Sequence, residues 1–248
     1  TEDFKEDAKI QFSSTKLNII NVLNTDYVSF DGFIFDKIRG DAFTTNLGVE
    51  ELNLYNCEFK HISNRAVQYL ATMNYSGSSL AHVVNYNDGA KNCEVRNNRF
   101  INIGEYAIYF CGGERETLSN GNNVIANNYI YNASNKLRCK ANIAINGVYN
   151  YAINNEAHMG TFHALNHSGN ENVVAYNEFY NMLRDTGDCG VIYNGRQLAT
   201  RGTEIAYNYI HDHKHLDERT KDNGVGIYLD DRLSGINIHH NIIFANGI

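Results

Sequence analysis

The chain has 248 residues, a net charge of −7 and no proline or tryptophan, whereas 37 of its residues are asparagine. It has no basic run, which disfavours nonspecific binding to nucleic acid, and no apolar stretch approaches the ~18 residues of a membrane span. An apolar share of 43% argues against disorder. Since asparagine is unfavourable within helices and strands but favoured at turns, it must occupy a repeated structural position.

One motif recurs along the chain: an apolar-x-apolar strand, one or two residues, Asn, one residue, and two mostly apolar residues. A fixed motif with variable spacing indicates one rigid corner per coil of a solenoid, with insertions confined to loops. The eight copies span residues 27–33, 52–59, 93–100, 124–130, 151–157, 173–179, 204–210 and 236–243. Their marked residues are Asp31, Asn56, Asn98, Asn128, Asn155, Asn177, Asn208 and Asn241.

Asn suits this corner because a sharp turn between two strands needs one residue with positive φ, which Asn adopts at little cost. Coils ~4.8 Å apart would let the Asn amides bond from coil to coil as a ladder. A second strand per coil is predicted at 106–110, 190–193 and 226–229. Because parallel crossovers are right-handed, we predict an all-β, right-handed parallel β-helix. Neither the Leu spacing of leucine-rich repeats nor a propeller period is present.

The whole of 1–248 is expected to form one domain. The last copy of the motif ends at Ile248 without a second strand, so we expect a capping element or further coils beyond it. The opening Thr1-Glu2-Asp3-Phe4 is not a signal peptide, which points to a removed leader or to a start inside a longer protein.

The cysteines are scattered, odd in number and never in C-x-x-C spacing, which excludes a zinc site or a disulfide framework. We expect them to be small buried residues of a stacked core. They are Cys57, Cys93, Cys111, Cys139 and Cys189.

The densest polar cluster lies between residues 184 and 232, where two segments flank strands on neighbouring coils. Asp188 precedes one strand, and Asp230 and Asp231 follow the next. Two carboxylates on adjacent coils suit the cleavage of a glycosidic bond, one as general acid and the other as nucleophile or base.

The sequence order is Asp-x-Gly-x-Ile-Tyr-x-Gly-Arg, Arg-Gly, Tyr-Asn-Tyr-Ile-His-Asp and Gly-Ile-Tyr-Leu-Asp-Asp, followed by a further Asn-marked strand. Over residues 141–248 it resembles carbohydrate-active right-handed β-helix proteins, closest to glycoside hydrolase family 141, known for fucosidase and xylanase activities. Upstream, the resemblance amounts to the repeat alone. It implies Asp188 and Asp230 as the catalytic pair, with three residues lining the site: Arg196, Tyr193 and Asp231.

One departure weakens any inference about the substrate. Gln197 and Leu198 stand where this family has an acidic residue and a Trp, so a sugar-stacking platform is missing. Tyr193 and Tyr228 are the tyrosines most suited to contact a sugar, and the other tyrosines are expected to stack between coils.

The geometry of the pair leaves an alternative open. If Tyr193 and Tyr228 lie side by side, Asp188 and Asp230 are about 23 Å apart along a straight strand. They meet only if glycines at 187 and 190 bend Asp188 back over the sheet. Otherwise Asp188 is a turn residue that bonds its own backbone.

Several neighbouring polar residues are also candidates. Asp212 lies four residues past Asn208, as Asn102, Asn132 and Asn181 do in their coils, which predicts a corner residue first. His163 and His167 are candidates to reach the groove from the preceding coil. His211 is a further substrate-binding candidate, whereas His213 and His215 are expected in a solvated loop and no metal site is predicted.

We therefore predict a secreted or periplasmic glycoside hydrolase that acts on a polysaccharide or oligosaccharide without a cofactor, a nucleic-acid partner or a membrane span. The first alternative is a lyase or epimerase on uronic-acid glycans. Its base would be Lys214, His211 or Arg196, with positive charge supplied by Arg184, Arg196, Arg201 and Arg232. The second is a noncatalytic glycan-binding or adhesin β-helix, in which Asp188 and Asp230 lie far apart.

Overall fold

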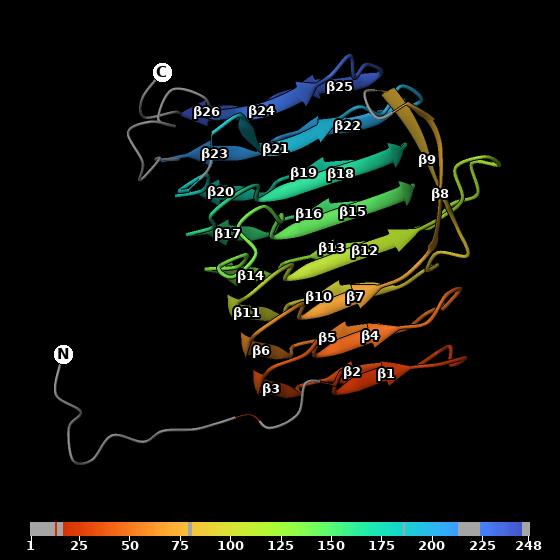
Figure 1. Cartoon of the computed structure of the whole chain (residues 1–248), viewed down its shortest axis with the longest axis vertical. Helices are drawn as coiled ribbons and strands as arrows, with labels where there is room; N and C mark the ends of the chain where they lie inside the picture. The colour runs from red at the N-terminus through yellow and green to blue at the C-terminus, as the bar shows by residue number, and fades with distance from the viewer. Residues whose placement is uncertain (1–12, 14–16, 79–80, 186, 213–223, 245–248) are drawn as a thin grey trace, which may run out of the picture.

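A computed structural model of the chain describes residues 13, 17–78, 81–185, 187–212 and 224–244. These residues contain no helix and wind through three eight-stranded parallel sheets, A, B and C (Figure 1). The chain passes from sheet A to sheet B to sheet C and then begins the next coil, so strands far apart in sequence lie side by side. The all-β class and the parallel sheets of many strands are thus confirmed, with three strands in each coil.

Sheet A carries the longest strands, and one row of its side chains points into the core while the next points outward. Its inward row includes Phe43, Val67, Ile108, Ile143 and Leu165, all fully buried. In order across the sheet, its strands are β1 (Ile20–Val22), β4 (Phe43–Thr45), β7 (Val67–Tyr69), β12 (Ile108–Gly112), β15 (Ile143–Val148), β18 (Leu165–Asn170), β21 (Cys189–Gly195) and β24 (Gly224–Asp230).

Sheets B and C consist mostly of three-residue strands whose middle residue is apolar. Sheet B comprises β2 (Ser29–Asp31), β5 (Asn53–Tyr55), β10 (Glu94–Arg96), β13 (Val124–Ala126), β16 (Tyr151–Ile153), β19 (Val173–Ala175), β22 (Thr203–Ala206) and β25 (Ile236–His239). Sheet C comprises β3 (Ile34–Ile38), β6 (Glu58–Ile62), β11 (Arg99–Ile103), β14 (Tyr129–Tyr131), β17 (Glu156–His158), β20 (Glu178–Tyr180), β23 (Tyr209–His211) and β26 (Ile242–Phe244).

The core consists of columns of like side chains. In sheet C, the rings of Phe35, Phe59 and Phe100 are stacked at centroid distances of 4.6 and 5.0 Å. In sheet A, Tyr69 stacks on Phe110 at 4.2 Å. Because equivalent residues of successive coils pair in register, rings stack over part of each column, and Ile130 and Ile145 continue the columns beyond Phe100 and Phe110.

Buried Asn side chains connect the coils at the corner between sheets B and C. The Asn128 amide donates to Asn155 Oδ1 at 3.0 Å, and the Asn155 amide donates to Asn177 Oδ1 at 3.0 Å. The amides of Asn128 and Asn155 also donate to backbone carbonyls of the coil before each of them. The side-chain oxygens of Asn155 and Asn177 each accept the backbone N–H of the preceding Asn in the column. The column continues from Asn98 through Asn128, Asn155, Asn177 and Asn208 to Asn241.

Two details of the predicted corner were wrong. The residue with positive φ is the one before the column Asn, such as Asn97 at 59° and Tyr176 at 59°. The marked residues of the first two copies were also wrong, because neither lies in the Asn column. Asp31 pairs with Tyr55 rather than with Asn56. In the second copy, the backbone N–H of Cys57 donates to Asn98 Oδ1, so Cys57 and not Asn56 takes the column position.

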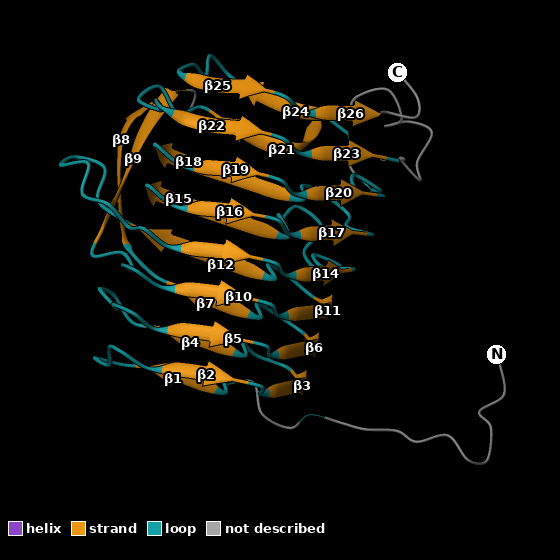
Figure 2. Ribbon diagram, turned by 180° about the vertical axis from the view of Figure 1, so that it is seen from behind, coloured by secondary structure: helices purple, strands orange, loops and turns teal. Residues whose placement is uncertain are grey.

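An antiparallel hairpin, β8 (Thr72–Ser78) and β9 (Ala81–Asn87), occupies the longest gap between copies and was not predicted. It stands along the side of the stack, parallel to the long axis (Figure 2). The Tyr86 hydroxyl at its base donates to Asn146 Oδ1 at 3.2 Å and is hydrogen-bonded to Ser168 Oγ at 2.9 Å. The hairpin is therefore held against the outer face of sheet A.

The cysteines follow the prediction with one exception. All five are free; four are buried, whereas Cys139 is exposed and that part of the prediction was wrong. Asp212 has a φ of 52°, as Asn102, Asn132 and Asn181 have 56°, 53° and 48° in their coils, so it is a corner residue as expected.

We expect Asn155→Ala to lower the free energy of unfolding by about 3 kcal/mol, because it removes the buried hydrogen bonds of this side chain to the coil before it and to Asn177. Chemical denaturation in urea measures the change. The matched control is Asn21→Ala on β1, where the side chain is exposed and the change should stay within about 0.5 kcal/mol. Equal losses in the two variants would contradict a stabilising role for the amide column.

Candidate functional site

The candidate site lies on the outer face of sheet A, where β21 pairs with β24. Tyr193 is in register with Tyr228, and Gly195 is in register with Asp230. The Tyr193 hydroxyl donates to Asp230 Oδ2 at 3.0 Å. A Cβ at position 195 would lie 2.7 Å from that hydroxyl and 3.0 Å from Asp230 Cβ, so this contact requires glycine.

Asp188 reaches the same place through a bend at the start of β21. Asp188 itself has a φ of 52°, and a Cβ on Gly190 would come within 2.6 Å of Tyr228 Cβ. Only glycine allows the strand to approach so closely. As a result, the Tyr228 hydroxyl donates to Asp188 Oδ1 at 3.3 Å, and the two carboxylates are not separated by the length of a straight strand.

Tyr228 lies close to both carboxylates: its hydroxyl donates to Asp188, and Asp230 follows it by two residues on the same strand. Burial raises the pKa of its phenol, and the negative charges of Asp230 and Asp188 and hydrogen bonding to both raise it further. Burial and the hydrogen bond to Asp230 likewise raise the pKa of Tyr193. Both tyrosines therefore stay protonated as hydrogen-bond donors to carboxylates near neutral pH.

A cavity of ≈ 290 Å³ opens beside these residues. His163 forms part of its wall, with its ring stacked on Tyr193 at a centroid distance of 4.5 Å and its Nδ1 donating to the Gly190 carbonyl at 2.6 Å. Burial lowers the pKa of His163 to about 4, so the ring is neutral. The cavity is lined by Tyr106, Cys139, Ala141, Phe162, His163, Asn166, Asp188 and Tyr193.

Arg196 and Asp231 lie at the edge of the site. Arg196 Nε donates to Asp231 Oδ2 at 2.6 Å, and the Asp231 backbone N–H donates to Asp230 Oδ1 at 2.8 Å. The hydrogen bond with Asp231 raises the pKa of Arg196. This pair thus places a compensated positive charge next to Asp230.

Two predicted contributors lie elsewhere. His211 is on β23 in sheet C, where its ring stacks on Tyr180 at 5.0 Å and its Nε2 lies 3.1 Å from Glu178 Oε1. His167 points into the core, fully buried, with Nδ1 3.4 Å from the Asn194 amide. The third strand of each coil places His211 in another sheet, whereas the alternation of side chains along β18 turns His167 into the core of the same sheet as the site. His213, Lys214 and His215 lie outside the described residues.

The sequence did not single out several residues that line the cavity, among them Tyr106, Phe162 and Asn166. The sequence could have identified Asn166 as a site residue. It precedes an inward-facing residue of β18, so its own side chain points outward, and it pairs with Tyr193. Phe162 and Tyr106 lie in corner segments, whose course depends on packing rather than on a repeating pattern.

Comparisons of the chain with protein-family models, with curated proteins and with solved structures found no match. Within the described ranges, no three His, Cys, Asp or Glu side chains gather as a metal-binding group. The same part of the chain holds no helix that is long and apolar enough to cross a membrane.

We expect the imidazoles of His163 and His167 to remain neutral until the pH nears 4, because burial lowers the pKa of each from 6.5 to about 4. The unfolded chain takes up these protons at higher pH, so stability is lost as the pH falls from 6.5 toward 4. Each pKa unit contributes about 1.4 kcal/mol. NMR titration of the ring resonances gives the midpoints, and a midpoint near 6.5 for His163 would contradict its burial.

Proposed function

We propose that this chain is a glycoside hydrolase that cleaves a polysaccharide with Asp188 and Asp230 as its two carboxylates. The observation that carries the proposal is that two tyrosines in register on neighbouring strands each hold one carboxylate: Tyr228 donates to Asp188, and Tyr193 donates to Asp230. Retaining enzymes hold the pair about 5–5.5 Å apart, and inverting enzymes about 6.5–9.5 Å.

The surroundings of the pair also suit a sugar. The cavity offers ring surface from Tyr106, Phe162 and His163 together with the polar amide of Asn166, and sites of this kind combine an apolar wall with a few oriented polar groups. The tyrosine hydroxyls keep both carboxylates oriented toward the outer face. In the proposed reaction, one carboxyl protonates the leaving oxygen and the other attacks the sugar or activates water.

The alternatives receive less support. A lyase needs positive charge to neutralise a substrate carboxylate, but Arg196 is already paired with Asp231, and Arg201 lies 3.7 Å from Glu171. A noncatalytic β-helix has no need for two carboxylates that converge from adjacent coils. Release of a product that absorbs in the ultraviolet would favour the lyase.

We expect Asp188→Asn and Asp230→Asn each to lower kcat by at least about 100-fold on the substrate, since general acid–base catalysis alone contributes about that much. Xylan and an aryl fucoside are the first probes, followed by reducing-end release or nitrophenol absorbance. The control is Glu204→Gln on β22, an exposed carboxylate on sheet B, which should keep full activity. Full activity in either Asp variant on a substrate that the wild type cleaves would contradict the assignment.

We also propose that the coils wind with a right hand and that the Asn column is the ladder of a right-handed parallel β-helix. The general handedness of parallel crossovers supports this. Because polysaccharides of this class lie outside the cytoplasm, we further propose a secreted or periplasmic location, to be tested by fractionation of the producing cells.

A further inference from the structure

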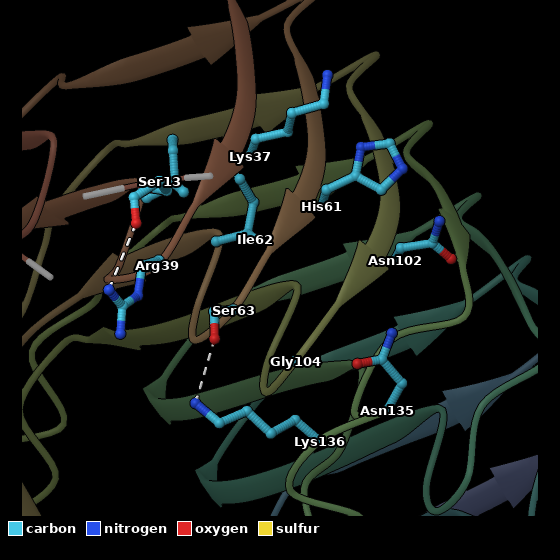
Figure 3. Close-up of a pocket in the computed structure, with 11 residues that line it drawn as sticks. Ser13, Lys37, Arg39, His61, Ile62, Ser63, Asn102, Gly104, Asn135 and Lys136 are labelled. Carbon is cyan, nitrogen blue, oxygen red and sulfur yellow. Dashed lines mark hydrogen bonds between the residues drawn. The ribbon is translucent and has the colours of Figure 1, made fainter. Parts of the chain in front are cut away.

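A second cavity, of ≈ 350 Å³, lies in the N-terminal half of the stack, along the coils of β3 to β14 (Figures 1 and 3). It opens at the corner where the chain leaves sheet C for sheet A, after strands β3, β6, β11 and β14. Four of its lining side chains are basic, although the chain as a whole has a net charge of −7. They are Lys37, Arg39, His61 and Lys136.

Successive coils place these groups in one column. Ile38, Ile62 and Ile103 are in register, so Arg39, Ser63 and Gly104 follow at equivalent positions. Gly104 has no room for a side chain, since a Cβ there would lie 1.9 Å from the Ser63 carbonyl oxygen and 3.3 Å from Lys136 Cβ. The Lys136 side chain therefore lies across the coil of Gly104 and reaches Ser63.

The charges of this cavity divide into two kinds. Lys37 and His61 both contact the carboxylate of Asp36, at 2.7 and 2.8 Å. Partial burial would raise the pKa of Asp36, but these hydrogen bonds outweigh it and lower the pKa. Asp36 is therefore ionised and compensates its two neighbours.

Arg39 and Lys136 differ, because they contact only neutral oxygens within the described residues. Arg39 donates to the Ser13 carbonyl at 3.4 Å. Lys136 donates to Ser63 Oγ at 3.3 Å and to Asn64 Oδ1 at 2.9 Å. Figure 3 shows the Arg39 guanidinium, the Ser63 hydroxyl and the Lys136 amine on the same side of the view. Among the described residues, two cations without a carboxylate partner thus lie near one hydroxyl.

We infer that this cavity binds an oxyanion carried by a sugar, either a sulfate ester or a uronate carboxylate of an acidic glycan. Arg39 and Lys136 would hold the oxyanion, because a guanidinium and an ammonium form charge-assisted hydrogen bonds with such groups. The amides of Asn102 and Asn135, which also line the cavity, would bond sugar hydroxyls. The inference goes beyond the proposed hydrolase activity and does not depend on it.

A nucleic acid fits this cavity less well. Binding to a phosphate backbone needs an extended basic face. In the part of the chain that the structure describes, this cavity has two cations without a carboxylate partner, on a protein with a net charge of −7. The volume is at the lower end of the range for small-molecule sites, which suits a single charged sugar unit of a longer chain.

The test is direct binding to the whole chain, by calorimetry, of dextran sulfate, polygalacturonate, neutral dextran and a single-stranded oligonucleotide. We expect at least one acidic glycan to bind, and its affinity to fall at higher salt. Binding of dextran sulfate alone identifies the sulfate ester, binding of polygalacturonate alone identifies the carboxylate, and binding of both identifies their shared oxyanion. Equal binding of neutral dextran, tighter binding of the oligonucleotide, or no binding of either acidic glycan overturns the inference.

The variants locate the site. Arg39→Gln with Lys136→Gln should weaken binding of the acidic glycan at least tenfold, whereas Lys60→Gln, a lysine of β6 paired with Glu58 outside the cavity, should not change it. Ser63→Ala, which keeps both charges, should weaken it less than the double variant does. Unchanged affinity in the double variant overturns the inference. Because binding is measured without turnover, a failure here is distinct from a failure of the Asp188 and Asp230 variants.

Discussion

The structure depends on one kind of hydrogen bond: the amide of a buried Asn that completes the backbone of the coil beside it. A sharp corner breaks the regular pairing of strands and leaves backbone groups in the interior, where an unpaired polar group costs about 1–3 kcal/mol. The Asn155 side chain pairs a backbone N–H and a backbone carbonyl of the coil before it and also bonds Asn177, the next Asn of the column. A second column, Asn123, Asn150 and Asn172, does the same at the corner between sheets A and B. The unusual Asn content thus follows from the number of corners.

Because these columns and the stacked rings fix the register inside, the outer faces are free to carry other chemistry. Asp230 and Tyr193 meet only because Gly195 leaves the space between them. The same holds for Lys136, which reaches Ser63 across Gly104. In both places, a glycine in the regular stack lets side chains from different coils come together, and the backbone that surrounds it hardly changes course.

The sequence predicted the parts of the fold that depend on a local, repeated pattern. The column from Asn98 to Asn241 follows from the motif, because each coil there meets the same backbone requirement. The motif gave the wrong column residue in the first two copies, where it marked Asp31 and Asn56. Phe33 and Cys57 occupy the column position there, and without an Asn at that position the sequence does not indicate the register. His211 was placed on the wrong face because the motif conceals a third strand in each coil. The proximity of Asp188 and Tyr228 required the bend at Gly190, which depends on the neighbouring coil and not on the residues around Asp188.

The two cavities lie on the same corner, between sheets C and A. The distance between their residues along the stack is therefore set by the number of coils that separate them. From the coil of Ser63 to the coil of Asp188 there are four steps, through β11, β14, β17 and β20, or about 19 Å at ~4.8 Å per step. Loss or gain of a coil would change that distance by one step and no less, whereas an insertion such as the β8–β9 hairpin leaves it unchanged. The separation of surface sites along the stack is therefore a whole number of coil spacings.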